Sequence, residues 1–137
     1  MEAGWRPVSG LHHVELWVPD LEAAKRSWGW LLAELGWALD EFGETTFSAA
    51  HGDTYLFVEQ SPALTGDRHD RRAPGVNHLA FHAGPRDRLD KLVGEAPAYG
   101  WSLLFADRHP YAGGPDHYAA YLEDTHGYEV ELVADAD

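Results

Sequence analysis

Two short segments of this chain place a histidine where it could bind a metal ion or a substrate. Residues 11–20 and residues 76–83 both alternate with a period of two, which predicts strands with different side chains on their two faces. His13 lies in the first segment and His78 lies at the corresponding place in the second. Since the two segments look alike, the sequence predicts one structural module written twice, with a histidine in each copy.

The strand face that carries each histidine also carries other polar side chains, which a face buried in the core would not. In the first segment, Glu15 and Trp17 share the face of His13, and both are predicted to line a pocket. In the second segment, His82 shares the face of His78. Four residues of strand span about 13 Å, too far for both histidines to bind one ion. His82 is therefore predicted to line the pocket.

A carboxylate near the end of the chain is predicted to lie on the same side as the two histidines. Residues 128–133 read as a strand in which Glu129 and Glu131 share one face. If the opposite, apolar face packs on a helix, Glu131 points the same way as His13 and His78. Two imidazoles and one carboxylate can bind a divalent metal ion and leave coordination positions open for water or substrate, which catalysis requires.

The elements that position these residues follow the same order twice. Each histidine strand leads into a three- and four-residue apolar repeat typical of a helix, which stops at a Gly-Trp pair, and three more strands follow. We expect a lead-in over residues 1–10, a first βαβββ module over 11–60, a connector over 61–75 and a second module over 76–137. The two modules would form one compact α+β domain over residues 11–133.

Composition excludes several classes of partner. The formal net charge is −13, with 23 acidic and 10 basic residues, which argues against nucleic acid or an anionic membrane as partner. There is no cysteine, and hence no disulfide, thiolate metal site or thiol nucleophile. No segment has the length of a signal peptide's apolar run or of a membrane span, so a cytoplasmic protein is expected.

The paired modules, the strands H-V-E-L-W-V-P-D-L and N-H-L-A-F-H-A, and the ending Y-L-E-D-T-H-G-Y-E-V-E-L-V resemble the vicinal oxygen chelate superfamily. This group includes glyoxalase I, fosfomycin- and bleomycin-resistance proteins, methylmalonyl-CoA epimerase and extradiol dioxygenases. The resemblance covers residues 11–133. It implies curved mixed sheets that form a cup with helices outside, and a homodimer whose modules pair within or between chains.

The family pattern also implies a ligand set. It carries over to His13, His78 and Glu131 as metal ligands, for a divalent ion whose identity (Fe, Mn, Ni, Zn or Mg) the sequence leaves open. The fourth ligand of glyoxalase I has no counterpart, since the repeat places Leu56, or Phe57 after a slip of one residue, opposite Glu131. Glu59 is nearby but has the opposite strand parity to Leu56, which favours a three-ligand site.

Aromatic residues complete the candidate site. The spacing of Tyr121, Asp124, Gly127 and Glu131 resembles the end of the extradiol dioxygenase signature, in which the tyrosine supports the bound substrate, so Tyr121 is a candidate catalytic residue with Glu131. Trp101 and Tyr118 are candidate pocket residues. His117 does not stand at the spacing of the signature's histidine.

Two functions follow. The first is a metal-dependent enzyme, of lyase, isomerase or dioxygenase type, whose ion chelates a small substrate through adjacent oxygens. The second is a metal-independent protein that sequesters a drug-like molecule, as bleomycin-resistance proteins do. Aromatic residues would line its groove, and the acidic surface would suit a cationic ligand.

Overall fold

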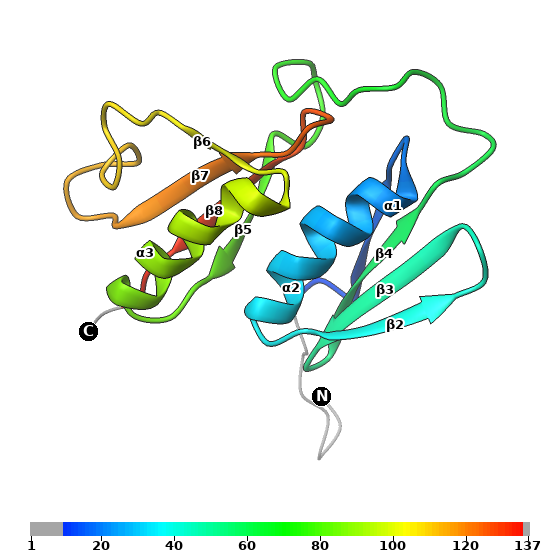
Figure 1. The fold of residues 1–137 in the computed structure, drawn as a ribbon, viewed down its shortest axis with the longest axis horizontal. Coiled ribbons are helices and arrows are strands. Elements are labelled where there is room, and N and C mark those ends of the chain that lie inside the picture. The colour runs from blue at the N-terminus through cyan, green and yellow to red at the C-terminus, as the bar shows by residue number, and fades with distance from the viewer. Residues whose placement is uncertain (1–9, 136–137) are drawn as a thin grey trace, which may run out of the picture.

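The computed structural model describes residues 10–135 and shows two modules of the same design (Figure 1). The first consists of β1 (His13–Trp17), a helix in three sections, α1 (Leu21–Ala24), η1 (Lys25–Gly29) and α2 (Trp30–Glu34), and then β2 (Ala38–Phe42), β3 (Thr46–His51) and β4 (Thr54–Glu59). The second consists of β5 (His78–His82), α3 (Arg86–Glu95), the 3₁₀ turn η2 (Ala96–Tyr99), β6 (Ser102–Leu104), β7 (Ala119–Glu123) and β8 (Glu129–Val133).

Each module folds into a four-stranded mixed sheet with the same strand order. The first sheet runs β1-β4-β3-β2 and the second runs β5-β8-β7-β6. In both, the histidine strand lies at one edge and pairs in parallel with the last strand of its module, and the remaining pairs are antiparallel. The predicted α+β class with paired βαβββ modules is confirmed. The sheets are curved.

The first helix begins and ends where its sequence predicts. The Asp20 side chain accepts a hydrogen bond from the Ala23 N–H at 3.2 Å and so caps the helix. Gly36 follows the last turn with φ of +89°, a backbone conformation that glycine adopts without a steric cost. The middle section is π-helical over Lys25–Gly29. None of the helices over residues 10–135 is both long and apolar enough to cross a membrane.

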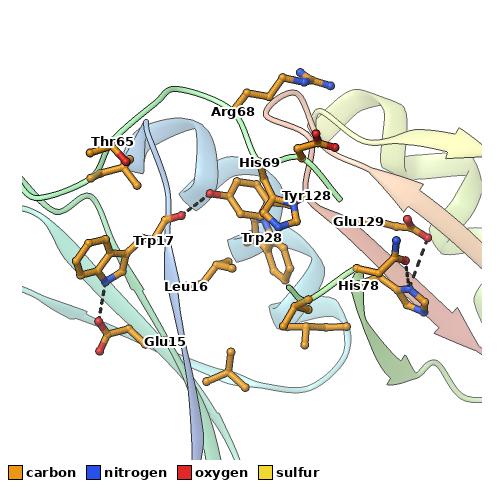
Figure 2. Close-up of a pocket in the computed structure, with 16 residues that line it drawn as sticks. Glu15, Leu16, Trp17, Trp28, Thr65, Arg68, His69, His78, Tyr128 and Glu129 are labelled. Atoms are coloured by element: carbon orange, nitrogen blue, oxygen red, sulfur yellow. Dashed lines mark hydrogen bonds and ion pairs between the residues drawn. The ribbon is translucent and has the colours of Figure 1, made fainter. Parts of the chain in front are cut away.

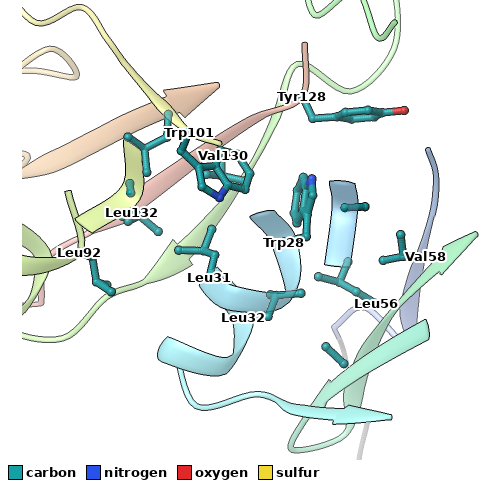
Figure 3. Close-up of a cluster of buried hydrophobic side chains, with 14 of the residues drawn as sticks. Trp28, Leu31, Leu32, Leu56, Val58, Leu92, Trp101, Tyr128, Val130 and Leu132 are labelled. Carbon is teal, nitrogen blue, oxygen red and sulfur yellow. The ribbon is translucent and has the colours of Figure 1, made fainter. Parts of the chain in front are cut away.

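One hydrophobic core joins the two modules (Figure 3). Trp28 of the first helix packs edge to face against Trp101, with ring centroids 5.4 Å apart, and also contacts Tyr128. Leu56 and Val58 approach the helix from the first sheet, and apolar side chains of β8 approach it from the second. Each sheet therefore turns one face toward the helices. The opposite face, called the open face below, carries His13 in one sheet and His78 in the other.

The connection between β6 and β7 is long. β6 contains only three residues, and β7 begins at Ala119. Phe105 has φ of +56°, which ends the extended conformation directly after β6. Residues 105–118, named the β6–β7 loop below, therefore lie between the strands.

Candidate functional site

His78 and Glu131 lie together on the open face of the second sheet. In the parallel pairing of β5 with β8, His78 is opposite Glu129 and Ala80 is opposite Glu131, so all four side chains lie on one face. The His78 Nε2 atom is 3.0 Å from Glu131 Oε1. Two residues that are 53 positions apart in the chain therefore interact directly, as their shared strand parity predicts.

A third side chain on this face comes from the β6–β7 loop. His117 Nε2 lies 2.5 Å from Glu131 Oε2, the carboxylate oxygen that His78 does not contact. The Glu131 carboxylate is thus bracketed by two imidazole rings. The sequence favours His117 little, because His117 does not stand at the spacing of the signature's histidine. The one available signal is its position, just before a strand that carries Tyr121 on the open face.

The charge on Glu131 is stabilised by these contacts. Burial by itself would raise the pKa of the Glu131 carboxyl, but hydrogen bonds with His117 and His78 outweigh burial and lower that pKa. Its neighbour Glu129 behaves in the opposite way, since burial raises the pKa of the Glu129 carboxyl against the attraction of His78 and Arg71. The nearest cation is the Arg71 guanidinium, whose Nη1 lies 3.4 Å from Glu129 Oε1.

Tyr121 borders the same carboxylate from β7. It pairs with Glu131 across the antiparallel ladder, and its ring meets the His78 ring edge to face at 5.8 Å. Burial and the charge of Glu131 raise the pKa of the Tyr121 hydroxyl, so this group stays protonated at neutral pH. A Cβ on Gly113 would lie 2.6 Å from the Tyr121 hydroxyl and 2.7 Å from His117 Cδ2. Any larger residue at that position would force the Tyr121 hydroxyl and the His117 ring to move.

His13 occupies a different environment from the other predicted metal ligands. Its ring stacks on Tyr55 at 4.8 Å, and its Nδ1 lies 2.9 Å from His12 Nδ1 at an exposed edge of the first sheet. Over residues 10–135, no group of three or more His, Asp or Glu side chains is arranged to hold a metal ion. Convergence of His13, His78 and Glu131 on one ion stays a prediction.

The strand register of the first sheet shows which residue of the first module is equivalent to Glu131 of the second module. Glu15 pairs with Phe57 just as Ala80 pairs with Glu131, so Phe57 occupies the equivalent position. Leu56, the residue that the repeat spacing favours, is buried on the helix side. Glu59 pairs with Trp17 at the far end of β1.

A cavity of about 380 Å³ opens between the edge strands β1 and β5 (Figure 2). Trp17 and Glu15 line one side, and Trp17 Nε1 donates a hydrogen bond to Glu15 Oε2 at 2.6 Å. His78 lines the opposite side together with Glu129, while the rings of Trp28 and Tyr128 lie between the two sides. The cavity therefore borders His78, the partner of Glu131, and its walls combine apolar with polar side chains.

Three predicted pocket residues lie elsewhere. Trp101 is only 2% exposed and donates its indole N–H to the Ser27 carbonyl, so it is a core residue that joins the modules rather than a pocket residue. His82 is paired with Asp135 at 2.8 Å, and its side chain is 89% exposed. Tyr118 donates its hydroxyl hydrogen to Asp90 and lies under the Arg86 guanidinium. Neither His82 nor Tyr118 lines the cavity between β1 and β5.

The side chains around Glu131 suit a divalent cation by donor type. A lowered pKa keeps the carboxylate anionic, and imidazole nitrogen together with carboxylate oxygen is the donor set that zinc, iron, manganese and nickel accept. The residues present therefore fit a metal ion by their chemistry, although each ring is at present hydrogen-bonded to a separate oxygen of the carboxylate. The same arrangement can bind a polar group of a substrate.

Comparison with known proteins agrees with the fold. Residues 12–121 match the model of the Glyoxalase/Bleomycin resistance protein/Dioxygenase superfamily. The uncharacterized protein YqjT of Bacillus subtilis is 43% identical over 126 residues, which cover 90% of this chain and 98% of YqjT. The crystal structure of a candidate glyoxalase from Bacillus halodurans superposes with a TM-score of 0.85 at 41% identity, covering 91% of this chain and 95% of that one.

A more distant structure shows the same fold. A glyoxalase/bleomycin resistance protein from Albidiferax ferrireducens has a TM-score of 0.73 at 21% identity and covers 92% of this chain and 98% of its own. The family model matches well over half of the chain, and the Bacillus proteins match nearly all of it. This chain belongs to the glyoxalase/bleomycin resistance protein/dioxygenase superfamily.

Proposed function

We propose that this protein is a divalent-metal-dependent enzyme that acts on a small molecule with two adjacent oxygen atoms. The observation that carries the proposal is the buried, anionic Glu131 carboxylate bracketed by His78 and His117 on the open face of a sheet. A carboxylate is rarely buried in this way without a cation or a reaction to serve. The cavity beside His78 offers room for a ligand of modest size.

His78 and Glu131 would hold the ion, and the family pattern adds His13 as a third ligand. A bound divalent ion supplies Lewis acidity, which stabilises negative charge that develops on a substrate oxygen. Tyr121, whose raised pKa keeps its hydroxyl protonated, donates a hydrogen bond to that oxygen. The apolar part of the cavity wall would hold the rest of the substrate.

A homodimer is part of this proposal. The open face of the first sheet exposes apolar side chains, with Phe42 48% exposed at its edge and Phe57 beside it. A second copy that covers this face could bring His13 to the other copy's second sheet, because His13 contacts neither His78 nor Glu131 within the described part of one chain. The reaction type, whether isomerisation, lyase chemistry or oxygen insertion, depends on the metal and the substrate.

The cavity itself supports a second candidate function. Trp17, Trp28 and Tyr128 give it aromatic walls, and the net charge of −13 favours a cationic partner. A metal-independent protein that sequesters a cationic aromatic molecule would need this cavity and no metal. In that case the Glu131 cluster would stabilise the sheet and would not touch the ligand.

Metal content separates the two functions. Protein purified without a histidine tag should contain about one equivalent of a divalent metal by elemental analysis, or bind it in titration calorimetry. Glu131→Gln removes the anionic ligand and should weaken metal binding by at least the roughly 10- to 100-fold that loss of a ligand's hydrogen-bond partner costs. Glu44→Gln, the same chemical change at an exposed turn, is the matched control and should leave binding unchanged.

The same two variants test the sequestering function. If the wild type binds none of Mn, Fe, Co, Ni or Zn, yet cationic aromatic ligands quench tryptophan fluorescence equally in wild type and Glu131→Gln, the enzyme proposal is wrong. The cavity would then be the functional site.

A further inference from the structure

We infer that Glu129 determines which ligands the cavity between β1 and β5 binds, by accepting a hydrogen bond from a neutral O–H or N–H group on an aromatic molecule. This inference deepens the proposed function and rests on one part of it, the use of this cavity as the ligand site. It involves no metal ion, and it gives a role to a residue that the proposed reaction leaves unused.

The first observation is a buried oxygen that lacks a donor. Glu129 lines the cavity on the same side as His78, with which it pairs across β5 and β8 (Figure 2). Its side chain is 3% exposed, and no group within residues 10–135 donates a hydrogen bond to its Oε1 atom. A buried acceptor without a donor destabilises a fold, and such groups are rare in native proteins. A ligand in the cavity would supply the missing donor.

The neighbouring side chains do not supply this donor. The Arg71 Nη1 atom is 3.4 Å from Oε1, which makes an ion pair but is longer than an ordinary hydrogen bond. The His78 Nδ1 atom is 3.8 Å from Oε2 and has a closer partner in Asn77 Oδ1 at 2.6 Å. The other ring nitrogen of His78 contacts Glu131. Because the last torsion of a glutamate side chain is broad, the Glu129 carboxylate can rotate to meet a donor in the cavity.

The charge around Glu129 favours a neutral donor over a cation. Arg71 also lies 3.0 Å from Glu123, and Arg68 lies 3.7 Å from the same carboxylate. Two guanidinium groups therefore balance the two carboxylates of Glu123 and Glu129. An ammonium group would lose its hydration on entering a cluster whose charge is already balanced. A hydroxyl or a neutral N–H loses less hydration and still gains a hydrogen bond to an ionised acceptor.

The walls of the cavity fit the flat, apolar part of such a ligand. The His69 ring stacks on the Tyr128 ring at 4.8 Å, and both residues line the cavity. The volume of about 380 Å³ lies within the range of small-molecule sites. On the opposite side, Glu15 already accepts the Trp17 indole N–H. Glu129 is therefore the carboxylate of this cavity that most needs a donor.

The experiment compares two probes by titration calorimetry at pH 7 in the presence of EDTA: naphthalenemethanol, which carries a hydroxyl group, and its methyl ether, which cannot donate. The readout is the ratio of their dissociation constants, because comparing this ratio between proteins cancels the difference in hydrophobicity. The wild type should favour the alcohol. Glu129→Leu should reduce this preference by about 10- to 100-fold, the value of a hydrogen bond to a charged group. Glu44→Leu, at an exposed turn, is the control and should change the ratio by less than about twofold.

A second variant keeps the test valid if Glu129→Leu does not fold, which circular dichroism shows. Glu129→Gln has nearly the same shape and offers a neutral acceptor in place of a charged one, so it should reduce the preference by about fivefold. An unchanged ratio in either folded variant overturns the inference. A wild type that binds neither probe overturns it as well. So does a wild type that binds naphthylmethylamine, a cation at pH 7, more than about 10-fold more tightly than the alcohol.

Failure of the inference and failure of the proposed function give different results. The probes carry no pair of adjacent oxygens and EDTA removes metal ions, so the ratio does not depend on a metal. A protein that binds a metal ion but shows no preference for the alcohol overturns the inference alone. A protein that binds no metal ion, yet shows the preference and loses it in Glu129→Leu, overturns the proposed metal dependence and supports the inference.

Discussion

Asp124 of the second module forms a hydrogen bond with Trp28 of the first module. Replacing Asp124 with asparagine tests how much this contact stabilises the fold. Its side chain is buried in the β7–β8 turn. Oδ1 accepts the backbone N–H groups of His126 at 2.9 Å and Tyr128 at 3.0 Å. Oδ2 accepts the indole N–H of Trp28 from the first module at 3.1 Å. Both carboxylate oxygens are acceptors here, and an asparagine side chain has only one.

The expected loss of stability follows from the missing hydrogen-bond acceptor. If the asparagine oxygen keeps the two backbone bonds, its NH₂ group faces the Trp28 N–H, and a buried donor without an acceptor costs about 1–3 kcal/mol. Burial raises the pKa of the Asp124 carboxyl, so removing the charge offsets part of this cost. We expect Asp124→Asn to lower the free energy of unfolding by about 1–2 kcal/mol and Tm by about 3–8 °C.

Urea unfolding at pH 7, followed by tryptophan fluorescence, measures the loss. Trp28→Phe and the double variant complete a thermodynamic cycle. Because the double variant no longer brings two donors together, its loss should be smaller than the sum of the single losses by about 1 kcal/mol. Losses that add within about 0.4 kcal/mol, or an Asp124→Asn protein as stable as the wild type, would refute this account of the contact between the modules.

Three further predictions concern the turn after β7, the tyrosine of the cavity and the site itself. Gly127→Ala places a Cβ 2.2 Å from the His69 carbonyl oxygen at φ of +89°, so it should cost more than about 3 kcal/mol in urea unfolding, whereas Gly43→Ala, at positive φ in open space, should cost about 1–2 kcal/mol. Equal losses would contradict the clash. Burial, with a smaller effect of Asp124, raises the pKa of Tyr128 to about 12, so Tyr128→Phe should leave the ultraviolet titration unchanged up to about pH 10.5, and a missing ionisation below that pH would disprove the burial. The lowered pKa of Glu131 means that its charge stabilises the fold fully above about pH 4.5, and that this contribution is lost as the pH falls through the lower folded value. The stability deficit of metal-free Glu131→Gln in urea unfolding should therefore shrink below about pH 4.5, and a deficit that does not change with pH would count against the hydrogen bonds with His78 and His117.

The amino-acid sequence by itself determined the architecture. Alternation in the strands, the Asp20 cap and the glycines after the helices are local signals, and each is read within one element. Because the same order of elements occurs twice, the two modules and their matching sheets followed without knowledge of long-range contacts. Strand parity also placed His78 and Glu131 on one face, since side chains alternate strictly along β5 and β8.

Tertiary structure decided which residues join that pair. The β6–β7 loop carries His117 to Glu131, and no periodicity describes the path of a loop. Trp101 is a candidate pocket residue by its sequence, but it packs against Trp28. The first helix brings Trp28 there, because this helix lies against both modules. Glu129, which shares a strand face with Glu131, is buried beside Arg71 from the connector. In each case the deciding contact comes from a segment distant in the chain, and only the folded core fixes the position of that segment.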